Sequence, residues 1–472
     1  MLFPTATFAA YFAVVFTLHV SLRAHVRWWK ATMLGASYVF YGWWDWRFCG
    51  LLALVTAVSW AAGRLMADRH RRWVLATAVA IDLGVLAGFK YYGFFVESLG
   101  QTLGPALTPP LVELVLPVGV SFYVFQAISY VVDVHRREIR PRPLGDVALY
   151  LAFFPQLVAG PIVRASEFLP QLSRFGRPAA DGALPPIEVS QAAWLIGRGL
   201  FKKVVIASYL AEHVVDPVYA APGAATRTEA ILAFYGYAIQ IYADFSGYTD
   251  MAIGIALLLG FRFPTNFDQP YRATSLQDFW RRWHMTLSRW LRDYLYVPLG
   301  GNRRGAIFTY RNLMITMVLG GLWHGAAWNF VLWGLLHGGY LAIERAWTRL
   351  RSTDSTSGAG TASGFPVRQW LITLHLVAIA WVPFRAETLD GARTVAWRLV
   401  TAPWGDAPSA LAVAVIAGAF ATQVLPADLG SRLQLIYARI DPALQSLAFG
   451  LWLFVVTTLG PDGVAPFIYF QF

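Results

Sequence analysis

Residues 320–338 read GGLWHGAAWNFVLWGLLHG, a stretch apolar and aromatic enough to lie in a lipid bilayer. It nevertheless contains two histidines, His324 and His337. Ionisable side chains are rare and costly at membrane depth, and they usually mark a functional site there. The stretch therefore predicts a membrane setting for the fold and a chemical role for a histidine within it.

The composition of the whole chain agrees with that setting. Of its 472 residues, 57% are hydrophobic and only 14% are charged, whereas a soluble domain has about a quarter charged residues. The apolar residues form long blocks, among them residues 8–20, 52–63, 74–89 and 411–421. Grouping such blocks gives roughly eleven hydrophobic spans, some short enough to be re-entrant. We therefore predict an all-α polytopic membrane protein.

The basic residues follow the positive-inside pattern of membrane proteins. The formal net charge is +11, and Lys and Arg gather in short loops such as residues 23–30, 64–73 and 135–143. Residues 97–110, by contrast, contain no Lys or Arg. This alternation predicts an external N-terminus and cytoplasmic basic loops, which anionic lipid headgroups would bind. We expect membrane lipids as partners of these charges, and no nucleic acid.

Two further features narrow the class of protein. A single cysteine, Cys49, excludes an intramolecular disulfide framework and a cysteine-based metal cluster. No basic segment precedes the first apolar block, so we expect that block to be a retained membrane helix and not a cleaved signal.

The middle of the chain is less regular than its beginning. In residues 153–164, FFPQLVAGPIVR, two prolines and a glycine interrupt an apolar run between arginine-rich ends. Broken backbone at membrane depth survives only where it is buried in protein or lines a cavity. We expect this segment to dip into the membrane and return to the cytoplasmic face.

We divide the chain into four parts on these grounds. N-terminal membrane helices occupy residues 1–115, and a motif-rich core occupies residues 116–350. A flexible linker rich in Ser, Thr and Gly follows at residues 351–364, and C-terminal membrane helices occupy residues 365–472.

Residues 276–296 have the pattern of an amphipathic helix. At helical spacing, Trp280 and His284 share one face with Leu287 and Leu291, while Arg281, Arg289 and Arg292 group on another. A wide aromatic face opposed by arginines is typical of a helix lying in the membrane interface. Anchoring alone would explain much of this pattern, but a histidine on the buried face favours a functional role.

The spacing of His324 and His337 bears on a metal site. If residues 320–338 form one helix, the two side chains are about 20 Å apart and cannot share a site. The chain also lacks the His-Glu-x-x-His pattern, so we expect no metal. His324 has glycines beside it, which allow close approach of a ligand, and its imidazole can accept a proton. His337, nearer a basic end, is expected to be structural.

A third polar group lies in residues 237–254, YAIQIYADFSGYTDMAIG. Asp244, followed by Ser246 and Gly247, could bend the helix and line a polar cavity. Alternatively, these side chains form a buried hydrogen-bond network that fixes helix packing. The residues alone leave both interpretations open.

From about residue 116 to residue 472 the chain contains, in this order, the runs LPVGVSFYVFQAISYVVDVHR, FFPQLVAGPIVR, GLFKKVVIASYLAEHVVDPVY, QIYADFSGYTDMAIG, NFDQPYRATSLQDFWRRWHMTLSRWLRDYLYVPLGGNR, GGLWHGAAWNFVLWGLLHG, WVPFRA and FIYFQF. Together these runs resemble the membrane-bound O-acyltransferases, and within them the bacterial branch that acetylates alginate.

The resemblance implies a fold and a set of site residues. The family fold is a ring of tilted helices around a central tunnel, which joins a cytoplasmic donor side to an extracytoplasmic acceptor side. The catalytic histidine of the family falls on His324, expected to be a general base, and the second signature histidine falls on His284. Further candidates for substrate binding are the side chains of Asn329, Asp244, Arg281, Arg289 and Trp323.

The function implied is acyl transfer across the bacterial inner membrane. The donor would be a cytoplasmic acyl thioester such as acetyl-CoA. The acceptor would be a hydroxyl of an extracytoplasmic polysaccharide, reached directly or through a partner acyltransferase.

Two alternatives to acyl transfer remain open. One is a proton-coupled transporter with His324, His284 and Asp244 as a proton relay. The absence of an internal repeat in the sequence argues against a transporter. The other is a scaffold or export component of an exopolysaccharide complex.

Overall fold

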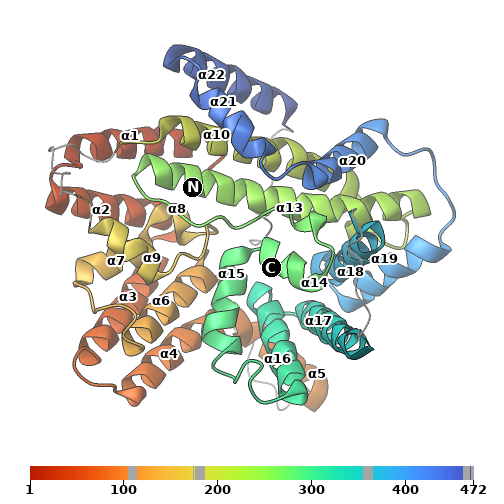
Figure 1. The fold of residues 1–472 in the computed structure, drawn as a ribbon, viewed down its shortest axis with the longest axis horizontal. Coiled ribbons are helices and arrows are strands. Elements are labelled where there is room, and N and C mark those ends of the chain that lie inside the picture. Colours follow the sequence, from red (N-terminus) through yellow and green to blue (C-terminus); the bar gives the residue numbers. More distant parts are fainter. Residues whose placement is uncertain (105–113, 174, 176–185, 355–364, 461–467, 469–472) are drawn as a thin grey trace. The chain divides into compact units, whose positions relative to one another are not determined.

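The computed structural model describes residues 1–104, 114–173, 175, 186–354, 365–460 and 468. All regular structure in these ranges is helical, which confirms the all-α prediction (Figure 1). The chain forms two compact units. The first contains Met1–Leu200, Tyr248–Pro264 and Tyr437–Trp452, and the second contains Phe201–Gly247, Thr265–Ile436 and Leu453–Phe472.

The helices follow one another closely along the chain. Up to residue 200 they are α1 (Ala6–Leu22), α2 (Val26–Asp45), α3 (Arg47–Leu65), α4 (Arg72–Leu86), η1 (Ala87–Tyr91), α5 (Tyr92–Leu103), α6 (Val120–His135), α7 (Leu144–Ala152), α8 (Phe154–Leu157), α9 (Ala165–Leu172) and α10 (Val189–Leu200). From residue 201 they are η3 (Phe201–Ala207), α11 (Ser208–Leu210), η4 (Ala211–Val215), α12 (Asp216–Ala220), α13 (Arg227–Leu258), η5 (Pro270–Arg272), α14 (Leu276–Arg282), α15 (Met285–Leu291), η6 (Arg292–Tyr296), α16 (Ala306–His324), α17 (Trp328–Asp354), α18 (Val367–Arg385), α19 (Leu389–Thr401), α20 (Ala410–Val424), α21 (Leu429–Ala438) and α22 (Pro442–Leu459).

Among the described residues, four helical segments are long and apolar enough to cross a membrane: Arg47–Leu65, Arg72–Leu103, Val367–Arg385 and Pro442–Leu459. The pair α20 and α21, bent by 92°, would make a fifth. These segments support a multi-pass membrane protein, but the expectation of roughly eleven spans, which rested on block length, is not confirmed. One reason is that an apolar run such as α6 forms a helix buried within the protein, and hydropathy does not distinguish such a helix from a span.

The first unit is built around α6. Nearly every side chain of α6 is buried, and α3, α4, α7 and α9 pack against it. Its first turn follows Gly119, which has a φ of +75°. A Cβ at this position would lie 2.6 Å from the carbonyl oxygen of Leu157, so only glycine permits this contact.

The interrupted segment, residues 153–164, lies within the first unit. After α7 ends, the single turn of α8 is followed by non-helical backbone until α9 begins. Every side chain from Phe153 to Val163 is buried. The break in the helix and its burial in protein are as predicted; its path through a membrane stays a prediction.

The second unit contains a tight helical hairpin formed by the stretch 320–338. The helix α16 ends at His324, and α17 begins four residues later, packed against it (Figure 1). Glycines permit this packing, because a Cβ at Gly321 would lie 2.1 Å from the carbonyl oxygen of Phe330. The helix α17 then continues to Asp354, into the predicted linker; residues 355–364 lie outside the described residues.

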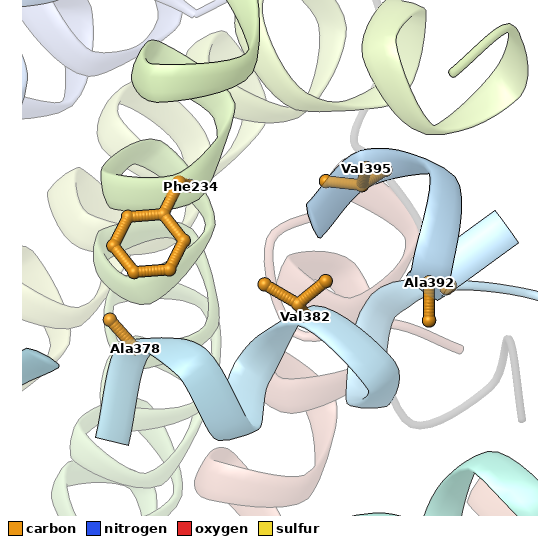
Figure 2. Close-up of a cluster of buried hydrophobic side chains, with 6 residues drawn as sticks. Phe234, Ala378, Val382, Ala392 and Val395 are labelled. Carbon is orange, nitrogen blue, oxygen red and sulfur yellow. The ribbon is translucent and has the colours of Figure 1, made fainter. Parts of the chain in front are cut away.

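A small apolar cluster holds α18 in the second unit (Figure 2). Phe234 of α13 lies next to Ala378 of α18, and Val382 is on the side of α18 that faces α19. The cluster is completed by Ala386, Ala392 and Val395. It matters for the site because α18 also contributes Trp381 and Phe384.

Candidate active site

His284 lies in a break between two short helices. The helix α14 ends at Arg282 and α15 begins at Met285, so the prediction of one interfacial helix over residues 276–296 is wrong. His284 itself has a φ of +41°, in the left-handed region that non-glycine residues rarely adopt. Because His284 leaves helical conformation, the residues on either side of it do not share one helical face.

Asn266 supports this break from the loop that precedes α14. Its side-chain oxygen accepts hydrogen bonds from the backbone N–H of Thr286 at 3.1 Å and the hydroxyl of Thr286 at 2.9 Å. The same oxygen lies 3.2 Å from Nδ1 of His284, and the backbone oxygen of Asn266 accepts from the N–H of Met285. These contacts fix the orientation of the His284 ring, whose Nε2 has no hydrogen-bond partner.

The electrostatic state of His284 follows from its burial. Its side chain is fully buried, and α14 and α15, with seven residues each, are too short to cross a membrane. Removal from water lowers the pKa of His284 to about 3. The ring is therefore neutral at physiological pH. One of its nitrogens can donate a hydrogen bond and the other can accept one.

The fold brings His324 to His284. Their ring centroids are 6.5 Å apart, although they lie forty residues apart in sequence. Trp323 contacts both rings, at 6.0 Å from His284 and 5.1 Å from His324. His324 also packs edge-on against Trp333 at 5.1 Å and Phe384 at 5.2 Å. The two histidines thus meet in a buried, aromatic environment.

His337 contacts Trp333, the same side chain that contacts His324. The estimate of about 20 Å between the two histidines assumed one helix, and the turn between α16 and α17 removes that assumption. His337 is fully buried, with its ring 4.7 Å from Trp333. Neither of its ring nitrogens has a hydrogen-bond partner, and an unsatisfied buried polar atom typically costs about 1–3 kcal/mol.

A cavity of about 740 Å³ adjoins α14 and α15. Arg281 and Arg289 line it, together with Arg292 and Arg345 and one acidic side chain, Glu344. Trp280, several apolar side chains and some uncharged polar ones form the rest of the wall. Such a combination suits a ligand with an anionic end and an apolar arm. Neither His284 nor His324 lines this cavity, so the predicted tunnel stays a prediction.

Asp244 forms a buried ion pair with Lys203, and its second oxygen accepts a hydrogen bond from the backbone N–H of Ile468 at 3.0 Å. The helix α13 runs without interruption past Ser246 and Gly247. These contacts favour the packing-network interpretation of this group over a polar cavity. A site role for Asp244 in binding a substrate stays a prediction.

Comparison with known proteins identifies the chain. The model of the membrane-bound O-acyltransferase family matches residues 120–379. The chain is a membrane-bound O-acyltransferase. It is 42% identical over 411 residues to the probable alginate O-acetylase of Azotobacter vinelandii, covering 85% of this chain and 78% of that protein.

Two other relatives of this acyltransferase are similar along most of their length. The probable alginate O-acetylase of Pseudomonas aeruginosa is 41% identical, over 85% of this chain and 74% of its own. The peptidoglycan O-acetyltransferase of Helicobacter pylori is 34% identical, over 84% of this chain and 79% of its own.

Two further predicted site residues, Asn329 and Trp323, make different kinds of contact. Asn329 donates from its side-chain nitrogen to the carbonyl oxygen of Ala386 at 2.6 Å, which ties α17 to the end of α18. Trp323 contacts the rings of both His284 and His324. In the part of the chain that the structure describes, no three His, Cys, Asp or Glu side chains are grouped closely enough to hold a metal ion.

Sequence reasoning did not single out several residues at this site. Asn266 stands in an irregular loop, and Trp333 and Phe384 stand in apolar helical runs where aromatic residues are common. No motif marks them, because their importance comes from tertiary contacts. Lys203 could have been found from the sequence, because a lysine within an apolar run indicates that its charge pairs with a buried acidic side chain.

We predict that Asp244→Ala lowers stability by about 3–5 kcal/mol, because it leaves Lys203 buried without its counter-charge. The double variant Lys203→Met with Asp244→Asn should recover most of that loss. Thermal unfolding of the detergent-solubilised protein measures both. Asp390→Ala, which removes an exposed ion pair with Arg393, is the control and should change the Tm little. Equal Tm values for Asp244→Ala and the native chain would contradict the prediction.

A second prediction concerns the support of His284. Asn266→Ala should destabilise the protein by about 1–3 kcal/mol, because the backbone N–H of Thr286 loses its acceptor, and it should slow acyl transfer by releasing the His284 ring. Asn266→Asp keeps both acceptor functions and should retain more stability and activity. Thermal unfolding together with thiol release from an acyl thioester tests this. Full activity in Asn266→Ala would show that the ring needs no such support.

Proposed function

We propose that this acyltransferase moves an acyl group from a cytoplasmic thioester to an extracytoplasmic hydroxyl, and that the acyl group is acetyl. The observation that carries the proposal is the meeting of His284 and His324, 6.5 Å apart, within a buried aromatic site. Acyl transfer to an alcohol needs a proton acceptor held where water is scarce, and a neutral buried imidazole meets that need.

His324 serves as the general base in this proposal. It takes the proton of the accepting hydroxyl as the hydroxyl oxygen bonds to the carbonyl carbon of the thioester. The tetrahedral intermediate then collapses, the carbon–sulfur bond breaks, and the thiolate leaves with the proton returned by His324. The products are an ester and a free thiol. His284, whose Nε2 has no partner, positions the thioester or polarises its carbonyl.

The cavity beside α14 and α15 is the proposed donor site. Arg281 and Arg289 line it, and guanidinium groups recognise phosphate oxygens with strong, directional hydrogen bonds. A coenzyme A thioester has that chemistry, with phosphates at one end and an apolar arm that leads to the acyl group. The apolar wall, including Met285 and Leu341, fits the arm.

The acceptor and setting are proposed from the relatives. Two relatives are named for acetylating alginate and one for peptidoglycan, and both substrates are polymers with many hydroxyl groups. We therefore assign this chain to a bacterial inner membrane, with a polysaccharide acceptor reached directly or through an extracytoplasmic acyltransferase partner.

His324→Ala should abolish acyl transfer while the protein still inserts and folds. The expected loss is at least about 100-fold in kcat, within the range for removal of a general base. The measurement is acetate release from surface polysaccharide of a complemented deletion strain, with membrane levels checked by immunoblot. His213→Ala, which removes an exposed histidine, should leave acetylation unchanged. Normal acetylation by His324→Ala would refute the assignment.

Arg281→Gln and Arg289→Gln should each raise the KM for acetyl-CoA about tenfold, since a hydrogen bond to a charged group is worth about 1.4 kcal/mol or more. The native KM should also rise with salt, and less so in the variants. Initial rates of thiol release in inverted membrane vesicles give these values. Arg432→Gln, at an exposed position, is the control. A native-like KM in both cavity variants would place the donor elsewhere.

A further inference from the structure

Three rings of the second unit form a compact cluster beside the proposed donor cavity. The ring of Trp280 lies 5.7 Å from Trp333 and 5.1 Å from His337, and Trp333 lies 4.7 Å from His337. Trp333 and His337 are almost fully buried. We call Trp280, Trp333 and His337 the ring cluster.

The polar atoms of the ring cluster have no hydrogen-bond partners. These atoms are Nε1 of Trp280, Nε1 of Trp333 and both ring nitrogens of His337. Other tryptophans of the same unit differ: Trp381 donates to the hydroxyl of Tyr271 at 3.2 Å, and Trp370 donates to the backbone oxygen of Tyr271 at 2.7 Å. Buried polar groups are usually paired, and orphaned ones call for a ligand, a water or a catalytic role.

Packing alone does not account for these residue types. Phe279 stacks on His337 at a centroid distance of 6.2 Å, so a neighbour of His337 in this cluster is itself an all-carbon ring. Phenylalanine in place of His337 or Trp333 would fill an apolar cluster without burying an unpaired nitrogen. The nitrogens are therefore best explained by something that enters the cluster.

The position of the ring cluster indicates what enters. Trp280 forms part of the wall of the arginine-lined cavity. Trp333 contacts the ring of His324 at 5.1 Å. The cluster therefore adjoins the proposed donor cavity through Trp280 and the proposed general base through Trp333.

We propose that the ring cluster binds the acyl carbonyl oxygen of the thioester donor, which accepts hydrogen bonds from Nε1–H of Trp333 and a ring N–H of His337. Nε1–H of Trp280 is the first donor that the acyl arm meets from the cavity. Negative charge develops on this oxygen when the hydroxyl attacks, and preorganised N–H donors in a dry site stabilise it strongly. Neutral rings do so without burying a cation. This inference rests on the proposed function.

The experiment separates recognition of the carbonyl from general support of the fold. The full chain in lipid nanodiscs is titrated with two unreactive coenzyme A derivatives. One keeps the acetyl carbonyl but has a methylene in place of sulfur, and the other is the ethyl thioether, which lacks the carbonyl. The readouts are the ratio of their dissociation constants, kcat for thiol release from acetyl-CoA, and the Tm.

Trp333→Phe and His337→Phe should each reduce the preference for the carbonyl-bearing derivative about 3- to 10-fold, the size of a net neutral hydrogen bond. Their kcat should fall about 100-fold, as for loss of an oxyanion donor, and their Tm should not fall. Trp280→Phe, at a half-buried position, is a second variant with less effect on packing. Trp370→Phe is the matched control, because it removes a paired indole N–H and should leave the preference unchanged.

An unchanged preference in Trp333→Phe, His337→Phe and Trp280→Phe, with native transfer intact, would overturn the ring-cluster proposal alone. A native chain that binds neither derivative and releases no thiol from acetyl-CoA would overturn the proposed donor as well, and the inference with it. Equal weakening of both derivatives together with a lower Tm would assign the rings a structural role and also overturn the proposal.

Discussion

The close contact of α16 and α17 is the constraint on which the position of His324 and its aromatic surroundings depends. A side chain at Gly321 would collide with the carbonyl oxygen of Phe330, and one at Gly334 would collide with that of Met317. Without side chains at these positions the helix backbones pack directly against each other. The reversal of the chain then places His324, at the end of α16, against Trp333 of α17.

The second histidine depends on a different kind of constraint. A left-handed conformation at a residue with a large side chain costs about 1–3 kcal/mol and persists only where its surroundings hold it. At His284 the surroundings are Asn266, which fixes the following turn through Thr286 and Met285, and the ring of Phe245, 4.6 Å away. These contacts offset the cost of the left-handed conformation at His284.

The sequence predicted the features that depend on composition and missed those that depend on a single backbone angle. Apolar blocks gave the helical class, and the prolines of residues 153–164 gave the broken segment. The break at His284 left no trace, because a spacing of three to four residues is equally compatible with two short helices. The turn after His324 was missed for a similar reason: GAA contains no strong turn residue besides one glycine. The pairing of His284 with His324 came from family resemblance and not from spacing.

Buried polar groups around the candidate site fall into two kinds. Lys203 and Asp244 satisfy each other, and Asn329 is bonded to backbone; removing either contact would weaken the fold. Nε2 of His284 and the nitrogens of His337 have no such partner. An apolar environment penalises each unpaired polar atom. Stability alone would therefore not favour these groups at their buried positions. In the proposed function the acyl donor completes their hydrogen bonds, and the aromatic walls, by excluding water, would strengthen those bonds.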